Sequence, residues 1–103
     1  IELDALVDRA TFIGDAITQG LTKNFDGVTS VIDIRHKGLM IGIELDRACA
    51  PIVDLGLEAG LLINVTADKV VRLLPPLILD EKQIEFLVST LSSVITQFLS
   101  ESK

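Results

Sequence analysis

The chain has 103 residues, of which 49 % are hydrophobic and only 4 % aromatic, so one small domain must build its core from Leu, Ile and Val. Acidic residues outnumber basic ones by 15 to 9, and the net charge of −6 argues against binding nucleic acid or an anionic membrane. There is no membrane-span pattern or signal-peptide pattern, and the single cysteine, Cys49, cannot form an internal disulfide, which together predict a cytoplasmic location.

The first element of the chain is predicted to be a helix. Apolar residues recur every three or four positions from Leu3 to Leu21, which is typical of a helix with one buried face. Turn-forming residues from Asn24 to Gly27 then end it. Because the chain opens on Ile1 and enters this pattern at once, we expect it to be a fragment of a longer protein.

Two β-rich segments follow the first helix. Val28 to Arg35 is rich in β-branched residues, and Leu39 to Leu45 alternates between large apolar residues and other types. The three residues between them include Gly38, so the pair is predicted to form a β-hairpin.

The second half of the chain repeats this order and ends in a long helix. A short helix is predicted from Pro51 to Ala59, and a second hairpin from the strands Leu61–Val65 and Val70–Leu74. An unbroken apolar stripe then predicts a helix from Glu81 to Ser100.

The predicted fold class follows from the order of these elements. Asp80 and Gln83 have the spacing of a capping box at the start of the last helix. We expect an α+β fold, with a small, mostly antiparallel four-stranded sheet and helices on one face. A mixed sheet remains an alternative, because the helix between the two hairpins could make one strand pair parallel.

The residue types that carry catalysis are sparse in this sequence. There is one histidine and one cysteine, with no Ser-His-Asp arrangement and no spacing typical of metal ligands. We interpret His36 as a solvated turn residue and Cys49 as a small buried hydrophobe, although a position near a helix start would also suit a reactive thiol. Glu44 is interpreted as a water-facing carboxylate at a strand end, with a role in a site as the alternative.

Arg72 is the most informative single residue. It stands in the apolar run Val-Val-Arg-Leu-Leu-Pro-Pro, and strand alternation places it on the face opposite Val71 and Leu73. A guanidinium in such surroundings needs a partner, and its planar fork suits a carboxylate held at two points. A structural salt bridge and a ligand carboxylate are both open from the residues alone.

Two segments resemble the class III pyridoxal-phosphate aminotransferases. Lys37–Leu45 is similar to the family's GxGLMxGxEL segment, and Gly60–Asn64 followed by Val70–Leu77 is similar to its GLL…(V/I)RxxPPL segment. Cys49-Ala50-Pro51 and Asn64-Val65-Thr66 tilt the resemblance toward the acetylornithine group. The resemblance covers essentially the whole chain, and it departs from the pattern at His36, where the family often has Gly.

The resemblance implies that residues 1–103 are the C-terminal small domain of a fold-type I aminotransferase, which packs against the large domain of the same chain in a homodimer. It implies an activity that moves an amino group between N-acetylornithine and 2-oxoglutarate in arginine biosynthesis. It also implies that Arg72 binds a carboxylate of the amino-acid or 2-oxoacid substrate.

The resemblance further implies that pyridoxal phosphate is held as a Schiff base by a lysine of the large domain. The five lysines of this chain stand in turns, at a helix start or at the terminus, which is the wrong setting for that role: Lys23, Lys37, Lys69, Lys82 and Lys103. We therefore expect the fragment alone to be inactive, without catalytic, cofactor-binding or metal-binding residues of its own. The alternatives are a sister enzyme acting on ornithine, 4-aminobutyrate or succinyl-diaminopimelate intermediates, or a stand-alone module for binding or assembly.

Overall fold

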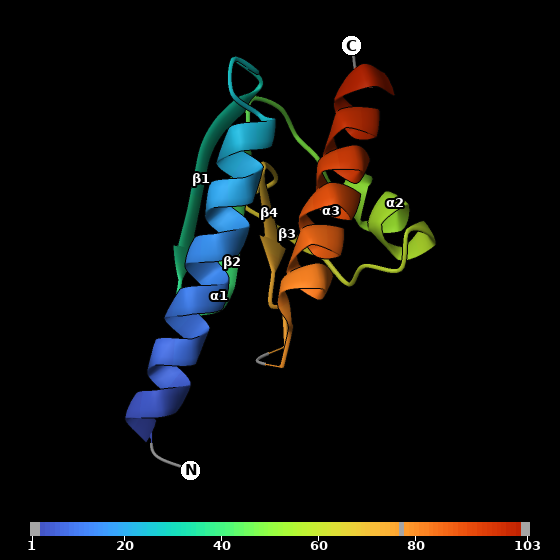
Figure 1. Cartoon of the computed structure of the whole chain (residues 1–103). Coiled ribbons are helices and arrows are strands. Elements are labelled where there is room, and N and C mark those ends of the chain that lie inside the picture. The colour runs from blue at the N-terminus through green and yellow to red at the C-terminus, as the bar shows by residue number, and fades with distance from the viewer. Residues whose placement is uncertain (1–2, 77, 102–103) are drawn as a thin grey trace.

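The computed structural model describes residues 3–76 and 78–101, and over these residues it confirms the predicted α+β order of helix, hairpin, helix, hairpin and helix (Figure 1). The elements are α1 (Leu3–Asn24), β1 (Val31–Lys37), β2 (Met40–Leu45), α2 (Ile52–Glu58), β3 (Asn64–Thr66), β4 (Val70–Leu73) and α3 (Glu81–Glu101).

The four strands form one sheet in the order β1-β2-β4-β3, and all three neighbouring pairs are antiparallel. The mixed-sheet alternative is therefore wrong. The second hairpin joins the first through β4 rather than β3, so the strand direction alternates across the whole sheet. The segment containing α2 spans the distance from β2 to the far edge, where β3 lies.

The helices cover one face of the sheet, as predicted. Helix α1 contacts β1 and β2, and α3 contacts both α1 and α2 (Figure 1). The periodic residues Ile13, Ile17 and Leu21 of α1 are completely buried against this face. The sheet contributes the alternate residues of its two central strands: Ile41, Ile43, Leu45, Val71 and Leu73. The apolar residues that recur every 3.6 positions in the helices and every second position in the strands therefore pack into one hydrophobic core.

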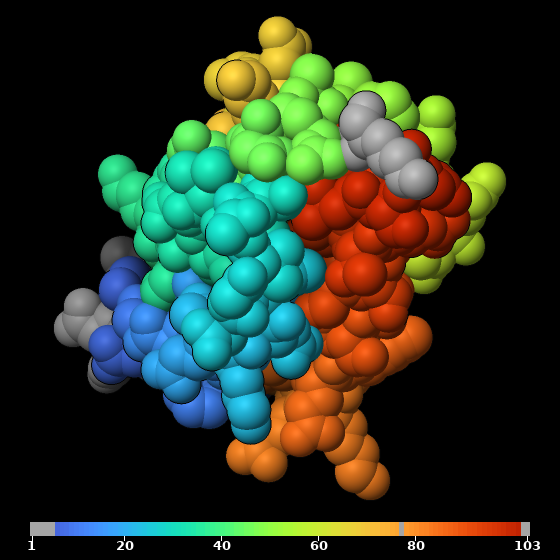
Figure 2. Space-filling model, turned by 90° about the horizontal axis from the view of Figure 1, so that it is seen from above, coloured from blue at the N-terminus to red at the C-terminus, as the bar shows by residue number. Residues whose placement is uncertain are grey.

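The two long helices run side by side in the same direction. In the first half of α1, the Arg9 guanidinium donates a hydrogen bond to the Leu79 carbonyl just before α3 (2.6 Å). At the last residue of α1, the Asn24 side-chain amide donates to the Ser92 hydroxyl of α3 (3.0 Å). Between these points a Cβ on Gly20 would lie 3.0 Å from Val88, so the backbone of α1 comes close to α3. In Figure 2 the blue and teal atoms of α1 and the following loop touch the red and orange atoms of α3.

The two ends of β1 differ from the prediction. The strand spans Val31–Lys37 rather than Val28–Arg35, because two turn hydrogen bonds, Val28 N–H to Phe25 and Val31 N–H to Val28, occupy the expected start. At the other end Lys37 pairs with Met40, which leaves a two-residue turn in place of three. Gly38 takes a left-handed φ of 57° in this turn.

The ends of the other elements follow local sequence signals. Asp80 and Gln83 form the predicted capping box, with N–H to side-chain oxygen distances of 2.9 and 2.8 Å. Gly60 takes a left-handed φ of 86° shortly after α2, a conformation that favours glycine at the end of a helix. Strand β3 begins at Asn64 rather than at Leu61. None of the helices within residues 3–76 and 78–101 has the length and apolar character needed to cross a membrane.

Candidate functional site

The sheet face that carries no helix presents one row of polar and small residues. The strand register pairs Arg35 with Gly42, Gly42 with Arg72, and Arg72 with Asn64, so these four residues lie at one level across all four strands. Because side chains alternate along a strand, the row faces away from the helices. We call it the open-face row.

Arg72 is half-buried in this row, with Val71 and Leu73 in the core behind it. The predicted alternation is therefore confirmed. Among the side chains that the structure describes, its guanidinium forms no ion pair, since the four pairs found there involve Arg35, His36 and Arg47. The structural salt bridge that the sequence left open has no counterpart among the described residues.

Two hollows flank Arg72 on the open face. One, of about 370 Å³, is lined by Arg35, Lys37, Gly42 and Arg72 among others. The other, of about 360 Å³, lies toward the sheet edge and is lined by Met40, Asn64 and Leu74 as well as Arg72. Three cations, Arg35, Lys37 and Arg72, border the first hollow, which favours an anion there. One of them, Arg35, is already paired with two carboxylates.

Arg35 is held in place by two carboxylates. Its Nη1 donates to Asp33 at 2.9 Å and to Glu44 at 3.3 Å. These hydrogen bonds, led by the one to Asp33, raise the pKa of the Arg35 guanidinium. Glu44 is partly exposed to water, with a side chain that is 39 % exposed, and it is also an ion-pair partner of Arg35.

The interpretation of His36 as a solvated turn residue is wrong. His36 belongs to β1 and faces α1, with a side chain that is 17 % exposed. Its Nε2 lies 2.7 Å from Asp15 Oδ1 and its Nδ1 lies 3.0 Å from the Gly38 carbonyl oxygen. The extra length of β1 moves His36 out of the turn, and both of its side-chain hydrogen bonds are with the scaffold.

Cys49 is completely buried in the core, which supports its interpretation as a small hydrophobe. Burial, with a smaller contribution from the charge of Asp68, raises the pKa of the thiol. A thiol that holds its proton and has no solvent access is a poor nucleophile.

Neither metal ligation nor a desolvated lysine is present in the part of the chain that the structure describes. No group of three His, Cys, Asp or Glu side chains there could hold a metal ion. Lys23, Lys37, Lys69 and Lys82 are all exposed. The fifth lysine of the prediction, Lys103, lies outside the described residues.

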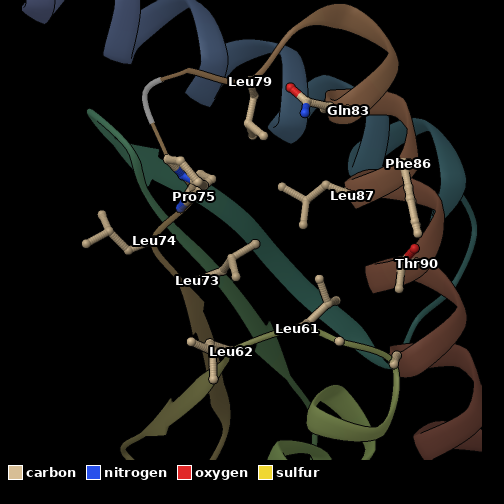
Figure 3. A pocket seen from close by; sticks show the side chains of 13 residues that line it. Leu61, Leu62, Leu73, Leu74, Pro75, Leu79, Gln83, Phe86, Leu87 and Thr90 are labelled. Carbon is tan, nitrogen blue, oxygen red and sulfur yellow. The ribbon is translucent and has the colours of Figure 1, made fainter.

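An apolar groove opens between β4, the segment before β3 and the first turns of α3. It has a volume of about 450 Å³ and is lined by Leu61, Leu73, Leu79 and Leu87, whose side chains converge on it, with Phe86 at the rim (Figure 3). The exposed fraction of Phe86 is 59 %. Other large apolar residues have still larger exposed fractions: Leu62 81 %, Leu74 65 % and Ile78 86 %. Such a concentration on a small chain is typical of a surface that meets another protein segment.

Sequence reasoning found Arg72 but missed the row in which it lies. The partners of Arg72 are set by the pairing of β2 with β4, and Arg35 joins the row only because β1 extends to Lys37. The alternation of the charged residues Asp33, Arg35 and Lys37 along β1 indicates that they share one face of the sheet. This signal could be used only if the strand was known to extend to Lys37.

A family model described as "Aminotransferase class-III" matches residues 1–95. Acetylornithine aminotransferase 1 of Bordetella bronchiseptica is 44 % identical over 103 residues, which is 100 % of this chain and 26 % of the Bordetella protein. Acetylornithine aminotransferase of Methanothermobacter thermautotrophicus is 43 % identical over 93 residues, covering 90 % of this chain and 24 % of that protein. The chain therefore spans about a quarter of the length of the relatives it matches.

The same relationship is found among solved structures. The ornithine aminotransferase of Toxoplasma gondii, crystallised in the presence of oxidised glutathione, has a TM-score of 0.80 and 25 % identity, covering 95 % of this chain and 24 % of that one. That structure has partial occupancy of PLP at the active site of the Toxoplasma protein. The match over nearly the whole chain confirms the predicted fold class.

Proposed function

The chain belongs to the class-III aminotransferases, and we propose that it is the C-terminal small domain, residues 1–103, of a pyridoxal-phosphate enzyme that transfers an amino group between N-acetylornithine and 2-oxoglutarate in arginine biosynthesis. The observation that carries this proposal is the 44 % and 43 % identity to two proteins named acetylornithine aminotransferase. The proposed parent enzyme is a cytoplasmic homodimer.

The residues of this chain do not fit the cofactor site. A lysine that forms a Schiff base needs a setting that lowers its pKa, and the four described lysines are exposed at the surface. We therefore assign the cofactor to the rest of the parent enzyme, and we assign this chain a role in holding the substrate.

Arg72 is the residue that we propose for substrate binding. A half-buried guanidinium without a partner among the described residues is stabilised when a carboxylate enters and accepts two parallel hydrogen bonds. Such a contact fixes both the position and the orientation of an amino acid or a 2-oxoacid, which is what alignment with a reactive centre requires. Apolar neighbours such as Met40 and Leu74 strengthen the contact by excluding water.

The apolar groove supports the assignment to a larger protein. About three quarters of the length of the relatives has no counterpart here, and the exposed side chains of Leu62, Leu74 and Phe86 give that missing part a surface to cover. We assign this surface to packing against the large domain.

Steady-state kinetics of the full-length enzyme tests the proposed function. With 2-oxoglutarate as the acceptor, kcat/KM should be highest for N-acetylornithine when it is compared with ornithine and 4-aminobutyrate. A preference for ornithine or 4-aminobutyrate would instead support one of the sister activities. The 103-residue chain supplied with pyridoxal phosphate should form no glutamate above the background of the free cofactor, and turnover above that background would contradict the assignment of the cofactor lysine to the large domain.

A further inference from the structure

Asp26 and Gly27 lie in the loop between α1 and β1, at one end of the molecule (Figure 1). Asp26 is the only aspartate in the sequence that is followed by glycine, and no asparagine is followed by glycine. Both residues are exposed and belong to the turn that ends α1. Because glycine has no Cβ, its backbone nitrogen is open to close approach by the side chain of the preceding residue.

The backbone N–H of Gly27 is not used by the fold. Its neighbours in the turn are both bonded: Asp26 N–H donates to the Lys23 carbonyl at 3.4 Å, and Val28 N–H donates to the Phe25 carbonyl at 2.9 Å. The Gly27 N–H between them donates to no residue that the structure describes. No hydrogen bond to a described acceptor therefore holds this nitrogen in place.

The Asp26 carboxylate is equally unconstrained, since it makes no hydrogen bond or ion pair with any described residue. Gly27 has a left-handed φ of 81°, and apart from its chain neighbours no atom lies within 4 Å of the place of a Cβ. Both residues line a surface hollow of about 410 Å³, which gives water access to them. A carboxyl carbon, a free amide nitrogen and water thus come together in one exposed turn.

We propose that Asp26 is a site of spontaneous isomerisation to isoaspartate. The Gly27 nitrogen attacks Asp26 Cγ, an N–Cγ bond forms, and the hydroxyl of the protonated carboxyl group leaves as water together with the N–H proton. Water then opens the resulting five-membered succinimide ring at one of its two bonds to nitrogen. Breaking the bond to Cγ restores aspartate, whereas breaking the bond to the backbone carbonyl carbon leaves Gly27 joined through Cγ, which is isoaspartate. The sequence of steps releases one water and consumes one, and needs no oxidant or other reactant.

The modification changes the backbone and not the mass or the charge. Isoaspartate adds one atom to the main chain of the turn, which displaces the 2.9 Å hydrogen bond between Val28 and Phe25. Phe25 is buried in the core at 6 % exposure, so the displacement reaches the packing of α1. The isomerised protein should therefore melt at a lower temperature than the unmodified protein, and equal melting temperatures would contradict this consequence.

Peptide mapping of the full-length enzyme, after several weeks at neutral pH and physiological temperature, tests the site. Trypsin cleaves after Lys23 and Arg35 and releases residues 24–35 as one peptide. A protease that cleaves before aspartate, but not before isoaspartate, then distinguishes the two forms. The unmodified peptide is cut before both Asp26 and Asp33, and the isomerised peptide only before Asp33. Asp33 is the internal control, because it lies in β1 and is paired with Arg35.

The account predicts that resistance to cleavage accumulates at Asp26 and not at Asp33. Gly27→Ala should slow the accumulation several-fold, because a Cβ hinders the approach to the nitrogen. Alanine is strained at a left-handed φ, so Asp26→Asn provides a second variant that keeps Gly27. It should form isoaspartate several-fold faster than the wild type, because a neutral amide is attacked more readily than a carboxylate anion.

A matched control is Asp54→Glu, which alters an exposed aspartate in α2 and should leave the rate at Asp26 unchanged. Wild-type enzyme that remains fully cleaved before Asp26 would overturn the proposal. An Asp26→Asn variant that keeps its amide over the same period would also overturn it, because the Gly27 nitrogen would then be unable to reach the side chain. Equal accumulation at Asp33 would show that the exposed turn does not select the site.

Discussion

The two faces of the sheet are built by different rules. On the helix-covered face the described residues satisfy one another. The aliphatic residues of β2 and β4 pack against those of α1 and α3, and His36 has Asp15 as its partner. On the open face Arg72 has no ion-pair partner among the described side chains, and a Cβ on Gly42 would meet only ordinary contacts, the nearest at 3.8 Å. The comparison teaches that the interactions of the described residues are complete on one face and incomplete on the other, and it is on the incomplete face that we propose the substrate site.

Truncation of two side chains on opposite faces of β2 should give the largest difference in stability between the two faces. Ile43 is completely buried on the covered face, whereas Met40 lines the hollows of the open face. Ile43→Ala should reduce the free energy of unfolding by about 2–5 kcal/mol, because it leaves a cavity in a close-packed core. Met40→Ala should cost well under half as much. Equilibrium urea unfolding of the two variants measures both values, and similar losses would contradict the distinction between the faces.

A pair of glycine substitutions should sharpen the comparison. A Cβ on Gly14 would lie 2.3 Å from the Gly38 carbonyl oxygen and 2.4 Å from His36 Nδ1. Gly14→Ala should therefore push α1 off the hairpin and cost on the order of 1–3 kcal/mol of stability. Gly42→Ala on the open face should be neutral or stabilising. If Gly42→Ala destabilised the chain as much as Gly14→Ala does, Gly42 would be a scaffold residue.

The smallest expected effect is a dependence of stability on pH that comes from the buried Cys49 thiol in the core. Burial raises the pKa of the Cys49 thiol in the folded chain, so the folded state keeps this proton at a pH where the unfolded state has lost it. This contribution to stability is complete below the unfolded pKa of about 8.5 and is lost as pH rises above it. Unfolding at pH 7 and pH 9.5 should therefore show a smaller decrease for Cys49→Ala than for the wild type. An identical decrease would mean that the thiol is equally acidic in both states.

The elements with strong periodicity could be predicted from the sequence. A helix or strand with one buried face must place its apolar residues at a regular spacing, so this spacing predicts burial directly. It does so for Ile13, Ile17 and Leu21 in α1 and for Ile41 and Ile43 in β2. The buried faces of the helices and central strands could therefore be predicted from the local sequence pattern.

The ends of β1 and the partners across the sheet could not be predicted in the same way. A hairpin turn of two residues instead of three is a small difference in length, but it moves His36 from the turn to the covered face. The open-face row depends on the pairing of β4 with both β2 and β3, which no local pattern encodes. Arg72 could be proposed as a site residue from the sequence, whereas the register was needed to place Arg35 and Gly42 beside it.

The central claim is that Arg72 serves a substrate and not the scaffold. In the full-length enzyme, Arg72→Ala should lower kcat/KM for 2-oxoglutarate by roughly 30- to 1000-fold, the value of a lost charge-assisted two-point contact of about 2–4 kcal/mol. Arg72→Lys should also be impaired, because it keeps the charge but loses the planar fork. The most direct measurement is the melting temperature and the steady-state kinetics of Arg72→Ala on one preparation. The account predicts a large kinetic loss at a nearly unchanged melting temperature, and a clear decrease in melting temperature with wild-type kinetics would contradict it.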